Sequence, residues 1–505
     1  MPVDLSSPAH YGLVLLPEIV LSIWAMFILL LDVFQKGARS EPSASSIPWL
    51  TLAGVVLAGA ANLWIGIAGL EETGPAGMIA VDTFRIFANF VFLLAAALFV
   101  LISTRYIDEE RLRLGELYVL ILFATVGMMV FAGARDLIVM FIGLELMSLP
   151  IYVLTGINRR DPRSAEGALK YFLLGAFSSA FFLFGIALAY GGAGSTNVEE
   201  IARAIGVDGI GASSLLVVAT ALLAVGFGFK AAVVPFHMWT PDAYEGAPAP
   251  VTAFMAAGVK AAAFAGFIRV FMTAFPGLYA SWDAIAIWLA VLTMATANLI
   301  ALVQGNVKRM LAYSSIAHAG YLLVALAAAS MLGAASFLFY AVVYTLMTMG
   351  AFAVMMVVAR RGEERLDLEA YSGLGWRHPL LAVVMTIFLL SLAGFPFTGG
   401  FIGKFFILSA AVERGLVILA VVLVMASLIS YYYYLRIAWY MWFRDPVAGI
   451  TSEPAPLAPG MTVALVFAAV GVMFLGVFPG PLVELAERSA ASLLQIPAGL
   501  TRYGP

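Results

Sequence analysis

The 505-residue chain is 63% hydrophobic and only 11% charged, and its net charge is −3. About a quarter of the residues of a soluble protein are charged, so this chain has too few polar residues to cover the surface of a soluble protein of its size. A soluble enzyme, a disordered scaffold and a nucleic-acid-binding protein are therefore excluded, the last because the chain offers no basic surface. Without cysteine there is no disulfide, no thiolate metal site and no cysteine-ligated iron–sulfur cluster.

About fourteen apolar stretches are long enough to cross a membrane as helices, which takes about 20 residues each. Continuous runs of this length exclude a membrane barrel, whose strands need only about ten alternating residues. The fold class is therefore an all-α polytopic membrane protein. The predicted spans lie near residues 11–34, 47–70, 79–104, 116–134, 136–156, 164–190, 212–236, 248–273, 283–303, 308–330, 334–359, 378–412, 415–443 and 457–480.

The loop cations predict the orientation of these spans. Fifteen follow odd-numbered spans and five lie on the other side, so the positive-inside rule places both termini outside the cytoplasm. Residues 1–13 show no positively charged or Arg-rich targeting pattern, so no cleaved leader is predicted. The first group is Lys36, Arg39, Arg105, Arg111, Arg113, Arg159, Arg160, Arg163, Lys308, Arg309, Arg360, Arg361, Arg365, Arg377 and Arg444, and the second is Arg135, Arg203, Arg414, Arg488 and Arg502.

The seven other cations fall within or near the ends of apolar spans. Four of the chain's six lysines are among them, whereas arginine dominates the loops. Guanidinium stays protonated, but a buried ammonium can lose its proton near neutral pH, so intramembrane lysines suit a titratable relay. The seven are Arg85, Lys170, Lys230, Lys260, Arg269, Lys404 and Arg436.

Depth in the membrane separates these candidates. Lys260 and Glu145 lie about twelve and nine residues into their spans, near mid-membrane at about 1.5 Å per residue. Each costs about 2.5–3.5 kcal/mol there, so a proton or ion pathway is the default interpretation. A structural Glu–Lys ion pair between two helices is the alternative. Lys170 is shallower, about six residues into its span, and snorkelling to the interface is nearly as good an explanation for it.

The remaining charged groups of the spans are expected to be structural. The arginines anchor helix ends or pair locally, and the two acids have a structural role. This group comprises Arg85, Arg269, Arg436, Glu18 and Asp82.

Two spans carry polar breaks. In the seventh span, Lys230 is followed by Pro235 and His237. In the twelfth span, Pro396 and four glycines lie around the span centre, and Lys404 follows them. Proline removes a helical hydrogen bond and glycine makes an unwound turn cheap. Such backbone survives in a membrane only where it is buried in protein or lines a wet cavity. A tolerated packing kink is the alternative at either break.

The two breaks lie five spans apart, which predicts two five-helix repeats of inverted topology, a transporter signature. His318, within the tenth span, either relays protons between the repeats or hydrogen-bonds Tyr and Ser neighbours. The predicted units are 1–115 with spans 1–3, 116–273 and 283–443 with the two repeats, and 444–505 with the last span and an amphipathic tail on the outer surface.

Five segments resemble the antiporter-like membrane subunits of respiratory complex I, from about the fourth to the thirteenth span. WTPDAYEGAPAPV points to the N branch of that family, Lys404 disfavours the M branch, where glutamate is expected, and the L branch would add a long lateral helix. The segments are GLELMSLPIYVL (143–154), ALKYFLLGAFSSAFFLFG (168–185), PFHMWTPDAYEGAPAPV (235–251), NVKRMLAYSSIAHAGY (306–321) and GFPFTGGFIGKF (394–405).

The resemblance implies a proton-translocating subunit of a bacterial plasma-membrane NADH:quinone oxidoreductase. Glu145, Lys230, Lys260 and Lys404 match the family's relay residues, with His318 as a further relay candidate. Protons would enter from the cytoplasm, pass along the membrane midplane and leave near Lys404, while Glu145 modulates Lys230. NADH, flavin, iron–sulfur clusters and quinone are expected on other subunits, so this chain would hold no cofactor and no metal.

The resemblance also implies partners, namely the other antiporter-like and small membrane subunits of the membrane arm, together with the lipid bilayer. Two other functions remain open at this point. One is a subunit of a multisubunit cation/proton antiporter without redox coupling, and the other is a passive scaffold whose buried charges only lock the arm together.

Overall fold

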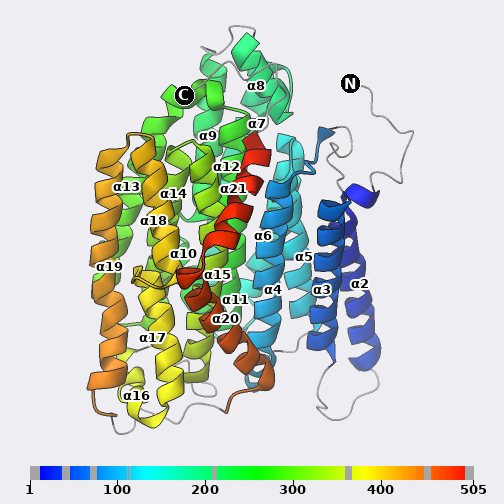
Figure 1. The fold of residues 1–505 in the computed structure, drawn as a ribbon. Helices are drawn as coiled ribbons and strands as arrows, with labels where there is room; N and C mark the ends of the chain where they lie inside the picture. The colour runs from blue at the N-terminus through cyan, green and yellow to red at the C-terminus, as the bar shows by residue number, and fades with distance from the viewer. Residues whose placement is uncertain are drawn as a thin grey trace.

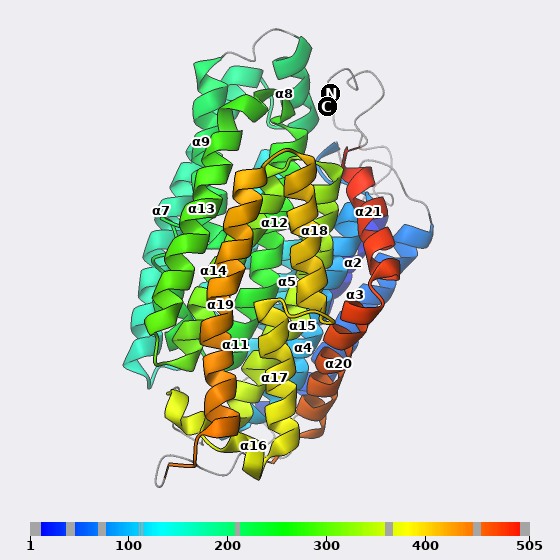
Figure 2. The same cartoon turned by 60° about the vertical axis from the view of Figure 1, so that its left-hand side comes forward.

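A computed structural model of the chain describes residues 12–36, 46–68, 77–110, 112, 115–207, 213–358, 367–447 and 456–494. These residues form an elongated bundle in which the long helices run roughly side by side (Figures 1 and 2). The described part contains no strand, only three isolated backbone bridges. His10, the two chain ends and several of the loop arginines used for the orientation lie outside the described residues.

Thirteen segments of the described chain are long and apolar enough to cross a membrane, and each coincides with a predicted span. The remaining predicted span, 378–412, is divided into two shorter helices, α17 (Pro379–Ala393) and α18 (Gly399–Glu413). The thirteen are α2 (Leu16–Lys36), α3 (Ile47–Ile67), α4 (Thr83–Glu109), α5 (Gly115–Gly133), α6 (Leu137–Thr155), α7 (Pro162–Ala193), α9 (Ser214–Ala231), α11 (Ala249–Phe254) with η3 (Met255–Val259) and α12 (Lys260–Thr273), η4 (Pro276–Leu278) with α13 (Tyr279–Val303), α14 (Val307–Ala327), α15 (Met331–Val358), α19 (Val417–Phe443) and α20 (Pro459–Val477).

Five short elements complete the described fold. In Figure 1, α8 lies at one end of the bundle and α16 at the other. The segment predicted to be an amphipathic tail forms α21, which buries Ala486, Ala490 and Leu493. α21 packs against α4 and α15, and its position at the outer surface stays a prediction. The five are α8 (Val198–Val207), α10 (Thr240–Gly246), η5 (Leu368–Tyr371), α16 (Leu374–Arg377) and α21 (Gly480–Leu494).

Several helices begin at capping residues that the sequence supplies. Asp136 accepts hydrogen bonds from two backbone amides at the start of α6, and Asp161 accepts one at the start of α7, where Pro162 is the first helical residue. Asn306 caps α14 in the same way. These side chains satisfy amides that lack a partner within the helix, so they fix where each helix starts.

The core of the bundle is formed by α12, α14 and α15. Their most apolar windows are 100%, 100% and 94% buried, against 33% for α7 and 39% for α19. The outer helices are nevertheless just as apolar, and they expose large side chains such as Phe177, Leu183 and Trp439. A helix that is apolar on its outward face as well suits hydrocarbon or another membrane subunit rather than water.

Arginine–carboxylate pairs inside the bundle join the third span to the first and to the eighth. Arg85 on α4 contacts Glu18 on α2 at 2.6 Å, and Arg269 on α12 donates two hydrogen bonds, of 2.7 and 2.9 Å, to Asp82 at the start of α4. Burial alone would raise the pKa of Asp82, but the adjacent Arg269 holds it below its usual value. The expectation that these charges pair locally is confirmed.

Both predicted breaks are present. α9 ends at Ala231, the next residue, Ala232, has a positive φ of 61°, and the chain re-enters a helix only at Thr240. α17 ends at Ala393, Gly394 follows with a φ of 90°, and α18 starts at Gly399. The two broken helices are confirmed, whereas the inverted relation between the repeats and the four unit boundaries stay predictions.

The Arg269–Asp82 pair generates the first prediction. Replacing Arg269 with Gln should leave the buried Asp82 carboxylate uncompensated and cost about 3–5 kcal/mol of stability. The purified variant should therefore aggregate at a clearly lower temperature than the parent protein. Arg488→Gln is the matched control, because Arg488 pairs with Glu484 with both side chains largely exposed. Equal thermal stability of the two variants would contradict the prediction.

Candidate functional site

The break after α9 positions Lys230. The residue lies in the last turn of the helix and is only 4% exposed. The unpaired carbonyls of a helix C-terminus carry partial negative charge, which favours an ammonium group there. The positive φ of Ala232 ends the helix just after Lys230, so the buried charge lies beside the break.

Lys230 is held by neutral oxygen atoms and aromatic rings. Its Nζ donates to Ser148 Oγ at 2.7 Å and to Tyr171 Oη at 3.1 Å. The same atom lies 5.3 Å from the ring centre of Tyr152 and 5.2 Å from that of Tyr171. Within the described chain no carboxylate lies within salt-bridge distance of Lys230, so the alternative of a direct Glu–Lys pair is not what the structure contains.

Glu145 acts on Lys230 through space instead. It lies on α6, one turn before Ser148, and therefore faces the same side of that helix. Its carboxylate accepts a hydrogen bond of 2.5 Å from Ser179 on α7. Glu145 is the acid whose charge attracts the Lys230 ammonium. A movement of α6 against α9 would change this attraction together with the Lys230–Ser148 hydrogen bond, because Ser148 also lies on α6.

Lys260 follows an irregular turn of its helix. Residues 255–259 form the π-helical turn η3, and Lys260 is the first residue of α12. π-turns inside α-helices are frequent at functional sites. Lys260 is 2% exposed, and its Nζ donates to both the hydroxyl and the backbone carbonyl of Ser315 on α14. No carboxylate lies within salt-bridge distance of Lys260 in the described part of the chain.

His318 lies at the centre of a tyrosine cluster. Its Nδ1 is 2.5 Å from the hydroxyl of Tyr340, and its Nε2 is 3.0 Å from the hydroxyl of Tyr434. Tyr434 also hydrogen-bonds Ser314, which neighbours the Lys260 partner Ser315. The expected hydrogen bonds to Tyr and Ser neighbours therefore exist, and they connect His318 with the Lys260 site. A role in proton relay stays a prediction.

Lys404 sits at the second break. Its Nζ donates to the carbonyls of Leu392 and Ala393, at 2.9 and 2.8 Å, and so caps the end of α17. It also lies 4.7 Å from the ring centre of Tyr321, whose ring is 5.2 Å from that of His318. Lys230 and Lys404 thus both lie beside a break, but only the Lys404 ammonium caps helix-end carbonyls, whereas that of Lys230 is held by hydroxyls of α6 and α7.

The spacing between the predicted site residues differs along the structure. From Lys260 to Lys404 the polar groups follow one another closely, whereas Lys230 and Lys260 are separated by an aromatic wall in the described structure. This wall consists of Tyr171, Trp239 stacked on it at 4.0 Å, and Tyr244 at 6.1 Å from Trp239. Tyr244 in turn lies near Ser315, the partner of Lys260. The closely spaced row comprises Ser315, Ser314, Tyr434, His318, Tyr340 and Tyr321.

Several contact residues were missed from the sequence. Ser148 lies three residues after Glu145 and Tyr171 directly follows Lys170, so helical spacing could have suggested both. The partners on α14, α15 and α19 come from distant segments, and no local signal links them. Lys308 was counted as a loop cation, yet it is 0% exposed and donates to the Ala247 carbonyl.

The remaining intramembrane cations have structural partners. Arg436 donates to the carbonyls of Leu302 and Gln304, as expected for an anchoring role. Lys170 does not simply extend to an interface, because it bridges Asp242 at 2.7 Å and Glu166 at 2.6 Å.

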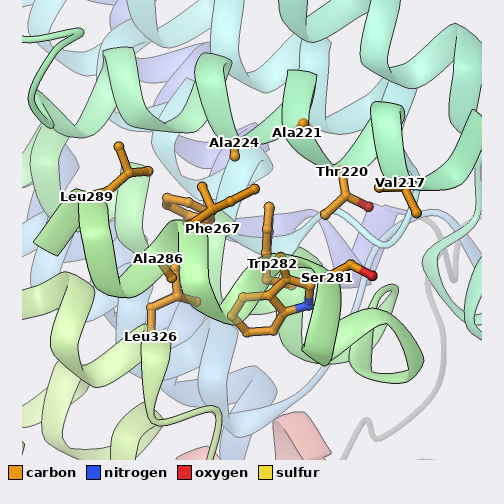
Figure 3. A pocket seen from close by; sticks show the side chains of 12 residues that line it. Val217, Thr220, Ala221, Ala224, Phe267, Ser281, Trp282, Ala286, Leu289 and Leu326 are labelled. Atoms are coloured by element: carbon orange, nitrogen blue, oxygen red, sulfur yellow. The ribbon is translucent and has the colours of Figure 1, made fainter. Parts of the chain in front are cut away.

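The groove shown in Figure 3 differs in character from the lysine sites. It lies between α9, α12 and α13, has a cavity volume of only about 40 Å³ and is lined almost entirely by apolar side chains such as Phe267 and Trp282. None of its lining residues is charged, so it suits hydrocarbon rather than a headgroup. Among the described residues no three His, Asp or Glu side chains cluster as metal ligands. The expectation that the chain holds no metal and no cofactor stays a prediction.

Comparison with known sequences gives consistent matches along the chain. The family model described as "NADH:quinone oxidoreductase/Mrp antiporter, TM" matches residues 134–430. The NADH-quinone oxidoreductase subunit N of Trichlorobacter lovleyi is 46% identical over 480 residues, covering 94% of this chain and 96% of the relative. The subunit N 1 of Solibacter usitatus is 42% identical, covering 98% and 100%.

Solved structures give the same result. A chain of respiratory complex I from Thermus thermophilus with bound aureothin is 36% identical, with a TM-score of 0.78, covering 93% of this chain and 99% of that one. A chain of the Mrp complex from Dietzia sp. has a TM-score of 0.83 at 21% identity, covering 97% and 98%, and shows likeness of fold alone.

The second break generates the next prediction. Gly394 has a φ of 90°, and a methyl group added there would lie 3.0 Å from Lys404 Cδ. Gly394→Ala should therefore displace Lys404 from the end of α17 in addition to straining the backbone, which costs about 1–2 kcal/mol. Gly415→Ala is the control, since its φ is 77° but nothing lies within 4 Å of the added group. Thermal unfolding should fall further for Gly394→Ala, and equal losses would contradict the role given to Lys404.

Proposed function

The chain belongs to the NADH:quinone oxidoreductase/Mrp antiporter transmembrane family, and from this premise we propose the route by which it moves protons. It is a proton-translocating membrane-arm subunit of NADH:quinone oxidoreductase, of the subunit N type. Its neighbours are other membrane-arm subunits within the bilayer. The chain contributes to catalysis as part of the complex, while flavin, iron–sulfur and quinone chemistry is assigned to other subunits.

The row of polar groups from Lys260 to Lys404 carries this proposal. It runs through the bundle across α14, α15, α18 and α19, from a fully buried lysine to a second one. Hydroxyl and imidazole groups can both donate and accept, so such a row can pass a proton in either direction. Intramembrane ionisable groups arranged in this way are typical of ion pathways.

Glu145 and Lys230 form the first station of the route. A proton taken up from the cytoplasmic side resides on Lys230, where Ser148 and Tyr171 hold it and the Glu145 charge stabilises it. A change in the Glu145–Lys230 distance driven by quinone reduction elsewhere weakens that stabilisation. The proton then moves to Lys260, along the His318 cluster and out near Lys404.

The hydrogen-bond partners explain how the lysines can change charge. No described carboxylate forms a direct ion pair with Lys230, Lys260 or Lys404, so no fixed negative charge traps the proton. Serine, tyrosine and backbone oxygens satisfy the ammonium, and serine and tyrosine can also donate to the neutral amine. Arginine would not serve, because guanidinium remains protonated.

The runner-up is a subunit of a cation/proton antiporter that works without redox chemistry. The likeness to the Mrp complex of Dietzia sp., at 21% identity, is compatible with it. The identities of 42–46% to N subunits over nearly full length favour the redox-driven complex. The two differ in one measurable property, because an antiporter exchanges ions in the absence of NADH.

The chain is a multi-pass membrane protein, consistent with the bacterial inner membrane. We place both termini on the non-cytoplasmic side, supported by the fifteen-to-five distribution of loop cations.

Lys260→Arg tests the relay directly. Arginine keeps the positive charge but cannot release its proton, so proton translocation per NADH oxidised should fall steeply while the assembled complex persists. The measurement is dye quenching in inside-out vesicles, normalised to NADH oxidation. Lys260→Met is the companion variant for the case in which the larger guanidinium prevents assembly.

Arg436→Gln is the control in that experiment, because Arg436 only anchors a helix end and lies outside the row. Normal translocation per electron in both Lys260 variants would refute the relay and favour the scaffold. Exchange of protons for cations without NADH would favour the antiporter.

Extraction of the tagged chain in mild detergent tests the assignment to the complex. On a native gel the chain should co-migrate with a large, flavin-containing assembly that stains for NADH dehydrogenase activity. Migration in a smaller assembly without this activity would instead support the antiporter.

A further inference from the structure

A cluster of charges that the proton route does not use lies on the short helix α10. Asp242 accepts from Lys170 on α7 at 2.7 Å and from Arg309 on α14 at 3.1 Å. Arg309 also contacts Glu245 at 2.6 Å. α10 therefore connects a helix of the first predicted repeat with a helix of the second. Burial would raise the pKa of Asp242, but hydrogen bonds from Lys170 and Arg309 hold it below its usual value, so it is ionised at neutral pH.

The backbone of α10 lies directly against α7. A Cβ added at Gly167 would lie 2.7 Å from the Asp242 carbonyl, and one added at Gly246 would lie 2.3 Å from the Arg163 carbonyl. Only glycine allows this close approach. α10 is thus seated on α7 by shape and held there by charge.

α10 also covers the Lys230 site. Trp239, immediately before α10, stacks on Tyr171 at 4.0 Å with an interplanar angle of 8°. Tyr171 is the residue whose hydroxyl accepts from Lys230, and it directly follows Lys170 in α7. Displacing α10 from α7 would therefore remove the aromatic wall on that side of the lysine.

We propose that the Lys170–Asp242–Arg309–Glu245 cluster is a latch that keeps α10 closed over Lys230 and limits access of water from the arginine-rich, cytoplasmic side. Two observations favour a releasable latch over a permanent structural tie. The four side chains are each about one-fifth to two-fifths exposed, unlike the buried Arg85–Glu18 pair, and α10 is a separate seven-residue helix after the break. Partly exposed pairs open at modest free-energy cost.

This inference rests on the proposed function, since it concerns access to the proton on Lys230. The four residues are positioning residues, because none of them contacts Lys230 or belongs to the relay. Their predicted effect is on how readily water reaches the chamber, and that quantity can be measured separately from proton translocation.

The chain contains no cysteine, so one introduced reporter gives an unambiguous labelled peptide. Thr240→Cys suits this purpose, since Thr240 is 0% exposed, lies at the start of α10, and its hydroxyl has no partner in the described structure. In vesicles containing the whole complex, a membrane-impermeant thiol reagent should label this cysteine slowly. Adding Asp242→Asn should raise the labelling rate roughly tenfold or more, because hydrogen bonds to charged groups that hold the closed state are lost.

The matched control is Glu166→Gln. Glu166 also pairs with Lys170, but its side chain is 64% exposed and no ion pair joins it to α10 in the described structure, so labelling should stay at the parent rate. Asp242→Glu keeps the charge and should restore slow labelling. Reagent added to right-side-out vesicles should label all variants slowly, since the latch faces the other side.

Unchanged labelling in Asp242→Asn, or an equal increase in Glu166→Gln, would overturn the latch. Where Asp242→Asn does not assemble, Arg309→Gln should give the same increase. Lys260→Met separates the two proposals, because it should stop proton translocation while labelling stays slow. Normal translocation in Lys260→Met would refute the route and leave the labelling result to decide the latch.

Discussion

The proposed route depends on three buried ammonium groups, those of Lys230, Lys260 and Lys404, none of which has a carboxylate partner in the described structure. An unpaired buried charge is costly, so every donor needs an acceptor, and here the acceptors are serine and tyrosine hydroxyls and backbone carbonyls. The type of partner distinguishes these three lysines from the arginines of the same bundle. Arg85 and Arg269 have carboxylate partners and hold helices together, whereas the lysines are solvated by groups that tolerate either charge state.

The broken helices follow from the same constraint. An intact transmembrane helix offers no free carbonyl at mid-membrane, because each is bonded within the helix. Ending α17 inside the bundle supplies such carbonyls, and Lys404 donates to two of them. Lys230 lies in the last turn of α9, beside the other break, but its ammonium bonds hydroxyls of α6 and α7. The π-turn before Lys260 interrupts the regular ladder of the eighth span in a milder way. The irregular backbone is therefore part of the charge environment and not a defect of packing.

Much of the architecture could be predicted from the sequence. The spans followed from hydropathy, and both breaks from Pro235 and from the Pro396–glycine segment, because these signals are local. The surroundings of the lysines could not be predicted in the same way. Tyr434, Ser315 and Tyr340 meet around His318 and Lys260 only through packing of α14, α15 and α19, and single polar residues in apolar helices give no periodic pattern. Asp242 follows the seventh span, and no local sequence signal links it to its partners on α7 and α14.

The two parts of the row differ in what they can do alone. Hydrogen bonds link Ser314, Tyr434, His318 and Tyr340, so small side-chain rotations could carry a proton within this cluster, and Tyr321 continues the row to Lys404 through ring contacts. Between Lys230 and Lys260, Trp239 contacts the rings of both Tyr171 and Tyr244, and no hydrogen bond joins these two tyrosines in the described structure, so a proton needs water to pass. The stretch that needs water is the one beneath α10. Control of the whole route is therefore best exerted there, where a short helix and a few partly exposed charges govern hydration of the chamber, rather than within the hydrogen-bonded cluster around His318.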